Sequence, residues 1–176
     1  MFLIVSGGSG SGKSEYAEKM AVDLFNKSKS QKLIYIATMI PFGNESLQKI
    51  ERHKNLRKGK GFTTLECFSE FKKFSENQDF LKATIILECM SNLIANEIFS
   101  DKNINAVSDV LAGILNINSN CDNLVLVTND VFSDGKIYDN ETMDYIEKLG
   151  KVNVELAKFA NSVVEVVFGI PIFLKK

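Results

Sequence analysis

Phe2-Leu-Ile-Val5 runs directly into Gly7-Gly-Ser-Gly-Ser-Gly-Lys-Ser14 at the start of this chain. The apolar run is typical of a buried strand, and the glycines leave backbone N–H groups free to surround a polyphosphate. In that arrangement Lys13 reaches the outer phosphates, the Ser14 hydroxyl binds Mg2+, and the following helix N-terminus adds partial positive charge. A flexible glycine linker is the alternative, but a linker has no reason to lie between a strand and an amphipathic helix. We therefore predict a nucleotide-binding loop made of Gly7, Gly8, Ser9, Gly10, Ser11, Gly12, Lys13 and Ser14.

The composition fits one globular enzyme domain. The chain has 176 residues, of which 45% are hydrophobic and 24% charged, enough to fill and to cover one core. A formal net charge of -1 argues against general nucleic-acid binding by the whole surface. The apolar runs have strand length and no signal peptide precedes Gly7, so we expect a cytoplasmic protein without a membrane span. Cys67, Cys89 and Cys121 are spaced for neither a disulfide framework nor a zinc site, and we expect reduced, mostly buried thiols.

Apolar strand patterns alternate with helical patterns along the whole chain, which is typical of an α/β protein. Expected strands cover 2–6, 32–38, 62–67, 83–88, 123–128 and 162–168, with a short last strand after Pro171. The first helix follows the glycine loop and has Ala17, Met20, Ala21 and Leu24 on one face. Further helices are expected over 45–60, 69–80, 90–99, 104–116 and 141–160. We predict one domain, 1–176, with a P-loop NTPase-like, doubly wound, mostly parallel sheet flanked by helices and ligands at the carboxyl ends of its strands.

Glu88 ends the apolar strand Ala83-Thr-Ile-Ile-Leu-Glu88. In a sheet of this type that strand end lies beside the phosphate loop, where a carboxylate holds Mg2+, usually through water, or orients the attacking group. The alternative is an acid that caps a helix or lies on the surface. We favour the metal role, shared with Ser14.

His53 is the only histidine, and it lies in a basic segment, Lys49–Lys60. This segment has six lysines and arginines and only one acidic residue, so it would attract phosphate groups. Nearby cations lower the pKa of an imidazole and keep its neutral, nucleophilic form available. From spacing alone, the favoured interpretation is a solvated basic helix face that carries an incidental histidine.

The sequence resembles the bifunctional adenosylcobinamide kinase / adenosylcobinamide-phosphate guanylyltransferase family. The motifs that carry the resemblance follow the family's order along nearly the whole chain. His-Lys after Tyr-Ile-Ala-Thr is the most specific part. The full set is Gly7-Gly-x-x-Ser-Gly-Lys-Ser14, Tyr35-Ile-Ala-Thr38, Ile50-x-x-His-Lys-x-x-Arg57, Thr64-Leu-Glu-Cys67, Leu87-Glu-Cys89, Asn96, Leu126-Val-Thr-Asn-Asp-Val131, Gly150-x-x-Asn153 and Gly169-Ile-Pro171.

The resemblance implies two reactions. A nucleoside triphosphate, ATP or GTP, phosphorylates the hydroxyl of adenosylcobinamide, and the product then receives GMP from GTP. Carried onto this chain, His53 holds the GMP as a phosphoramidate while Lys13 and Mg2+ neutralise the leaving pyrophosphate. The family also forms homotrimers in which neighbouring subunits help to build the site. By the same resemblance the nucleotide contacts are Ala37, Thr38, Met39, Lys54, Asn55, Leu56, Arg57, Glu66 and Glu88. Either glutamate could read guanine, and the choice stays open.

The chain departs from the family pattern in the phosphate loop and after Val131, and the second departure concerns the kinase half. Gly10 stands where the family usually has arginine, and Phe132–Tyr138 replaces a turn with glycine and proline. Near the arginine expected in the next helix the chain has only Asn140, Thr142 and Met143. Two other functions stay open: a P-loop kinase for another small molecule, in which His53 only clamps phosphates, and a nucleotide-gated module that contacts nucleic acid through Lys49–Lys60.

Overall fold

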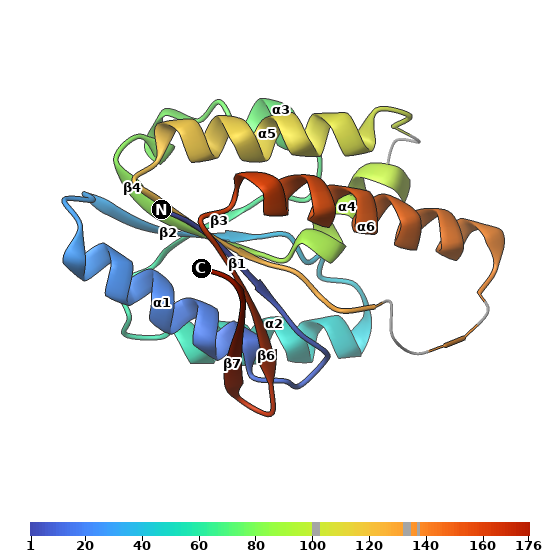
Figure 1. Cartoon of the computed structure of the whole chain (residues 1–176), viewed down its shortest axis with the longest axis horizontal. Helices are drawn as coiled ribbons and strands as arrows, with labels where there is room; N and C mark the ends of the chain where they lie inside the picture. Colours follow the sequence, from blue (N-terminus) through green and yellow to red (C-terminus); the bar gives the residue numbers. More distant parts are fainter. Residues whose placement is uncertain (100–102, 132–134, 137) are drawn as a thin grey trace.

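The computed structural model describes residues 1–99, 103–131, 135–136 and 138–176 (Figure 1). These residues form a seven-stranded sheet in the order β3-β2-β4-β5-β1-β6-β7, parallel except for the β6–β7 pair. The strands are β1 (Phe2–Ser6), β2 (Lys32–Ala37), β3 (Thr63–Glu66), β4 (Ala83–Glu88), β5 (Asn123–Val127), β6 (Ser162–Val167) and β7 (Ile170–Lys175). The helices are α1 (Lys13–Lys27), α2 (Gly43–Arg57), α3 (Phe71–Phe74), α4 (Met90–Phe99), α5 (Ala106–Asn120) and α6 (Asn140–Phe159), with a 3-10 turn η1 (Gln78–Phe80). The predicted fold class is confirmed.

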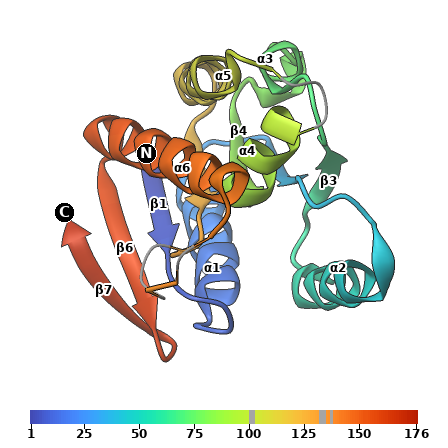
Figure 2. The same cartoon turned by 90° about the vertical axis from the view of Figure 1, so that its right-hand side faces the viewer.

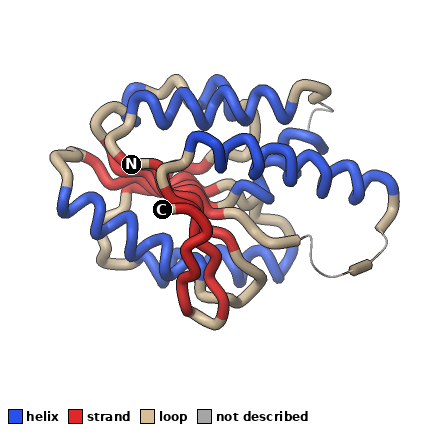
Figure 3. The backbone as a smooth tube through the Cα atoms, viewed as in Figure 1, coloured by secondary structure: helices blue, strands red, loops and turns tan. Residues whose placement is uncertain are grey.

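Strand β1 is apolar from Phe2 to Val5 because helices cover both faces of the sheet. Phe2 and Ile4 pack into the core beneath α3, α4, α5 and α6, whereas Leu3 and Val5 pack into the core beneath α1. Figures 1 and 3 show these helices as layers above and below the sheet. Each β1 side chain from residue 2 to 5 is at most 3% exposed, which explains the lack of alternation in the sequence.

The register of the strands brings three predicted site residues to one edge of the sheet. Ala37, the last residue of β2, is paired with Glu66 of β3 on one side and with Glu88 of β4 on the other. The glycine loop follows β1 at the same edge, since all these strands are parallel. Carboxyl ends of parallel strands are where ligands of such sheets bind.

Helix α2 differs from the other long helices because none of its residues, all of which are described, is buried. Figure 2 shows it standing apart from the sheet, on the side of the sheet where α1 lies. The surface helix expected over 45–60 is therefore present. No helix of the described residues is both long and apolar enough to cross a membrane.

The helix expected over 69–80 is wrong in length. The segment instead forms the four-residue α3, then a turn, then η1. Phe71 and Phe80 are both fully buried, and Asn77 interrupts the helix by accepting the N–H of Asp79 at 2.9 Å. Such local bonds from an asparagine compete with helical ones.

Other boundaries also differ from the prediction. Helix α2 covers Gly43–Arg57 rather than 45–60, α5 covers Ala106–Asn120 rather than 104–116, and the last strand begins at Ile170 rather than after Pro171. Proline, which has no backbone N–H, is tolerated in β7 because this strand forms one edge of the sheet.

Candidate active site

The glycine loop closes around the first turn of α1, which begins at Lys13. Gly7 must lack a side chain because a Cβ there would lie 2.6 Å from the carbonyl oxygen of Val166. Gly12 has a φ of 91°, a conformation that glycine adopts freely. The ammonium of Lys13 donates to the carbonyl of Gly8 at 3.0 Å, and its side chain is folded over the loop. Lys13 is only 8% exposed, and burial lowers its pKa.

Glu88 lies beside this loop, as predicted, and both carboxylate oxygens have partners. One accepts a hydrogen bond from the Ser14 hydroxyl, and the other accepts one from the Tyr35 hydroxyl at 3.0 Å. The two predicted metal ligands are therefore in direct contact. A hydroxyl and a carboxylate are hard oxygen donors of the kind that Mg2+ prefers.

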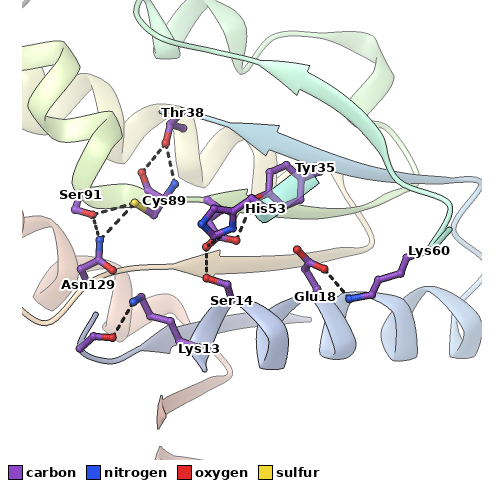
Figure 4. Close-up of polar contacts among 12 residues, drawn as sticks. Lys13, Ser14, Glu18, Tyr35, Thr38, His53, Lys60, Cys89, Ser91 and Asn129 are labelled. Carbon is purple, nitrogen blue, oxygen red and sulfur yellow. Dashed lines mark hydrogen bonds and ion pairs between the residues drawn. The ribbon is translucent and has the colours of Figure 1, made fainter. Parts of the chain in front are cut away.

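His53 reaches the same carboxylate from α2 (Figure 4). Its Nδ1 lies 3.6 Å from Oε1 of Glu88, and the side chain is only 14% exposed. Burial lowers the pKa of His53 most, and Arg52, Arg57 and Lys13 lower it further against the opposing effect of Glu88. From the sequence only the nearby cations were expected to lower this pKa; burial adds to their effect, and both causes favour a neutral imidazole. The interpretation of His53 as an incidental histidine on a solvated face is wrong for its position.

Polar and aromatic contacts, rather than a core, hold α2 against the body. The guanidinium of Arg57 lies over the Tyr35 ring, 4.4 Å from its centroid, and Arg57 Nε donates to Thr64 at 3.1 Å. Lys60, just beyond the helix, forms an ion pair of 2.7 Å with Glu18 of α1. The Glu18 side chain is fully buried, and burial raises its pKa.

Tyr35 and Arg57, together with the residues around Glu88, line a cavity of about 310 Å³ at the carboxyl edge of the sheet. One part is polar and holds Lys13, Ser14, His53 and Glu88, while Met39, Pro41, Leu47, Ile50 and Phe68 add apolar walls. Most of the predicted contacts lie on its surface. Those lining residues are Ser9, Gly10, Lys13, Ser14, Ala37, Met39, His53, Lys54, Arg57, Glu66 and Glu88.

The sequence also matches a known protein family and named relatives whose activities agree with a nucleotide-binding site. A model described as "Cobinamide kinase / cobinamide phosphate guanyltransferase", CobU, matches residues 3–174. The chain belongs to the CobU family. The proteins named bifunctional adenosylcobalamin biosynthesis protein CobU of Salmonella typhimurium and of Escherichia coli are each 28% identical to it over 189 residues, covering 99% of this chain and 100% of each relative. The chain is thus an enzyme of the CobU family.

Solved structures support the fold of this CobU family member. The flagellar accessory protein FlaH of Methanocaldococcus jannaschii matches with a TM-score of 0.53 at 14% identity, covering 99% of this chain and 77% of that one. An ATPase from the type III secretion system of pathogenic bacteria matches with a TM-score of 0.52 at 7% identity, covering 93% of this chain and 50% of that one. At these identities the likeness concerns the nucleotide-binding fold alone.

Seven predicted contacts do not line the cavity, three outside the glycine loop and four within it. Thr38 is buried, where its hydroxyl accepts the N–H of Cys89 and donates to the Cys89 carbonyl, both at 2.8 Å. It joins the ends of β2 and β4. Asn55 is exposed and donates to Glu51 at 3.4 Å, and Leu56 is half-buried outside the lining. Gly7, Gly8, Ser11 and Gly12 shape the loop from behind its cavity surface.

The site also contains residues that the sequence analysis did not name as contacts. The Tyr35 hydroxyl donates to Glu88, Glu18 pairs with Lys60 beside the cavity, and Cys89, Asn92 and Asn129 line it. The signal for Tyr35 was a hydroxyl inside a buried strand, because such a group needs a partner. All three cysteines are free, and Cys67 and Cys89 are buried, as expected.

The segment that departs from the CobU pattern lies partly outside the described residues, which omit 132–134 and 137. Asn140 begins α6, and Asp139 caps that helix by accepting the Thr142 N–H at 2.8 Å. Met143 is 47% exposed.

Proposed function

We propose that this chain phosphorylates adenosylcobinamide with ATP or GTP and then transfers GMP from GTP to the product through a guanylyl-histidine at His53. Membership of the CobU family and the names of its relatives support the two activities. The observation that carries the covalent step is the position of the His53 imidazole, which is mostly enclosed in the phosphate-loop cavity with Nδ1 3.6 Å from Glu88 and whose pKa is lowered by that burial. A surface helix that only clamped phosphates would have no reason to bury its imidazole.

The covalent step uses both ring nitrogens. With its proton on Nδ1, beside the Glu88 carboxylate, the ring presents the Nε2 lone pair to the α-phosphorus of GTP. The Nε2–P bond forms as the bond to the bridging oxygen breaks, and pyrophosphate leaves with the electron pair. Lys13 and the loop N–H groups stabilise its negative charge. The Glu88 carboxylate stabilises the positive charge that develops on the imidazole.

The second transfer restores the enzyme. A phosphate oxygen of the corrinoid attacks the same phosphorus, the P–N bond breaks, and its electron pair returns to Nε2. The imidazole is then neutral with its proton still on Nδ1. Phosphoramidates of imidazole are competent carriers because the ring is both nucleophile and leaving group.

Ser14 and Glu88 would hold Mg2+, which, when bound, neutralises phosphate charge. Their direct contact at the start of α1 supports this assignment. Because Glu88 is engaged at the phosphate end by Ser14 and Tyr35, Glu66 is the acid left to read guanine. It lies at the end of β3, beside Ala37, and lines the cavity.

We also propose that the chain forms the homotrimer typical of its family. Exposed apolar side chains on β7 support an interface there. Single scattered apolar residues are common on protein surfaces, whereas several along one exposed strand are typical of a contact surface. These residues are Ile170, Ile172, Phe173 and Leu174.

Labelling with GTP tests the covalent step. Purified protein is incubated with Mg2+ and GTP labelled separately at the α- and γ-phosphates, and protein-bound label is challenged with acid and alkali. We expect α-label that resists alkali but not acid, with release of pyrophosphate. His53→Ala should abolish it, whereas Glu51→Gln, an exposed change on the same helix, should retain it.

Absence of α-label, with and without the corrinoid phosphate acceptor, would contradict the covalent mechanism. Transfer of γ-label alone to a small alcohol would instead favour a plain P-loop kinase.

A further inference from the structure

Glu18, His53 and Glu88 form a compact group beside the nucleotide loop. One potential ligand atom from each lies within 4.8 Å of the other two. Within the described part of the chain, this is the one group of three or more histidine, cysteine, aspartate or glutamate side chains that meets so closely. The reaction proposed above uses His53 and Glu88 but gives Glu18 no task.

Two atoms of this group are buried without a hydrogen-bond partner. Oε1 of Glu18 has none, although the side chain is fully buried and Oε2 is paired with Lys60. Nδ1 of His53 has none either. In Figure 4 the Glu18 carboxylate lies between Lys60 and the side of the site where His53 is drawn. Buried polar atoms in folded proteins are nearly always satisfied, so this pair indicates a missing partner.

The donor set defines the partner's chemistry. The unpartnered Glu18 oxygen can only accept or coordinate, and an Nδ1 lone pair of His53 does the same, so the partner that meets both is a cation. An imidazole nitrogen suits Zn2+ and other late first-row metals better than Mg2+ or Ca2+, which take oxygen ligands. Ligands bound at about 2.1 Å in a tetrahedron lie roughly 3.4 Å apart. The separation of His53 Nδ1 from Glu88 Oε1, 3.6 Å, is close to that edge.

We propose that Glu18, His53 and Glu88 bind a transition-metal dication such as Zn2+ in the nucleotide-free enzyme, and that this ion prevents guanylylation of His53. Three protein ligands leave one coordination position for water. The ion would take the Nδ1 lone pair, so the ring proton would lie on Nε2 and no lone pair would be left there to attack GTP. The ion would also compete with Ser14 for the Glu88 carboxylate. The proposed zinc binding depends only on the three residues, whereas the block of guanylylation rests on the proposed function.

Zinc binding is measured directly on the full chain without nucleotide. Equilibrium dialysis with elemental analysis, in buffer containing millimolar Mg2+, should give one zinc ion per chain. Glu18→Gln and His53→Gln should each weaken binding by at least about tenfold, since even loss of an outer-shell partner has an effect of that size. Glu66→Gln, an identical change in the same cavity but outside the group, should bind zinc as the unchanged protein does.

His53→Gln keeps the test valid if Glu18→Gln does not fold, because His53 projects from a helix without buried residues. The site would be overturned if the unchanged protein failed to bind one zinc ion, or if both variants bound zinc as tightly as the unchanged protein. This outcome is independent of whether guanylylation occurs.

The block is tested separately with α-labelled GTP and excess Mg2+. Zinc added first should reduce labelling of the unchanged protein, and a zinc-selective chelator should restore it. Labelling of Glu18→Gln should resist zinc. If zinc inhibited both proteins equally, it would be acting on the nucleotide's metal instead, and the proposed block would be wrong.

Discussion

His53 is a functional side chain because of where it is buried rather than because of its basic neighbours. The imidazole leaves a helix that buries no residue, yet its own ring is mostly enclosed by the cavity. Enclosure disfavours the charged ring, and Arg52, Arg57 and Lys13 act in the same direction. The neutral ring is therefore the resting form near neutral pH.

This lowered pKa predicts the pH dependence of labelling. Only the neutral imidazole attacks, so the initial rate of α-label incorporation should rise as the pH increases through the pKa of His53 and then level off. The midpoint should lie below the ordinary value of 6.5. Rapid-quench labelling between about pH 5 and 8 measures it, with circular dichroism confirming the fold at each pH. A midpoint above 6.5 would contradict the burial argument.

At this scale the sequence could predict the local contacts but not the distant ones. The glycine loop and Lys13 are adjacent in sequence, and Glu88 was placed correctly because its strand is apolar up to the tip. Glu18 could not be found in this way, because its partner Lys60 is 42 residues away and meets it only when α2 folds back. Thr38 was expected to face the nucleotide, but its hydroxyl bonds the Cys89 backbone instead.

Among the elements, α3 shows how a short segment is positioned by one partner. Phe71 of α3 packs on Gly113 of α5, where a Cβ would lie 2.7 Å from the aromatic ring. The sequence predicted a longer polar helix because the charged residues between Phe71 and Phe80 make the segment read as a solvent-exposed helix, although both rings are buried. Periodicity could not show that these rings enter the core from two separate turns.

We expect Gly113→Ala to destabilise the fold by about 1–3 kcal/mol, because the added methyl group overpacks this contact. Urea denaturation measures the change. Ala112→Ser, at the neighbouring exposed position, should alter the free energy of unfolding by less than about 0.5 kcal/mol. Equal effects of the two substitutions would mean that Phe71 moves aside without cost.

For the whole molecule, the alternation of strands and helices was enough to predict a parallel α/β sheet. The order of the strands was not available from this alternation, because it depends on which strand ends pair across the sheet. The antiparallel β7 follows from a tight connection after β6, and the resulting hairpin leaves an apolar edge exposed.

The proposed trimer depends on that edge. The double substitution Ile172→Lys and Leu174→Lys should convert the trimer into a monomer, because burying two ammonium groups in an apolar interface is costly. Sedimentation velocity measures the change. Leu81→Lys, at an exposed apolar residue outside β7, should leave the trimer intact. A persistent trimer in the double variant would place the interface elsewhere, and a monomeric unchanged protein would contradict the trimer itself.

The central place of β1 has a consequence for protein synthesis. This strand pairs with β5 and β6, the Phe2 N–H donates to Asn161, and the Gly169 N–H donates to Ser11 in the glycine loop. Strand β1 and the glycine loop thus gain their full set of neighbours only after residue 169 has left the ribosome. A nascent chain cannot assemble its nucleotide loop early, so the emerging apolar β1 must wait for most of the polypeptide, and chaperones that protect such segments would bind it during that interval.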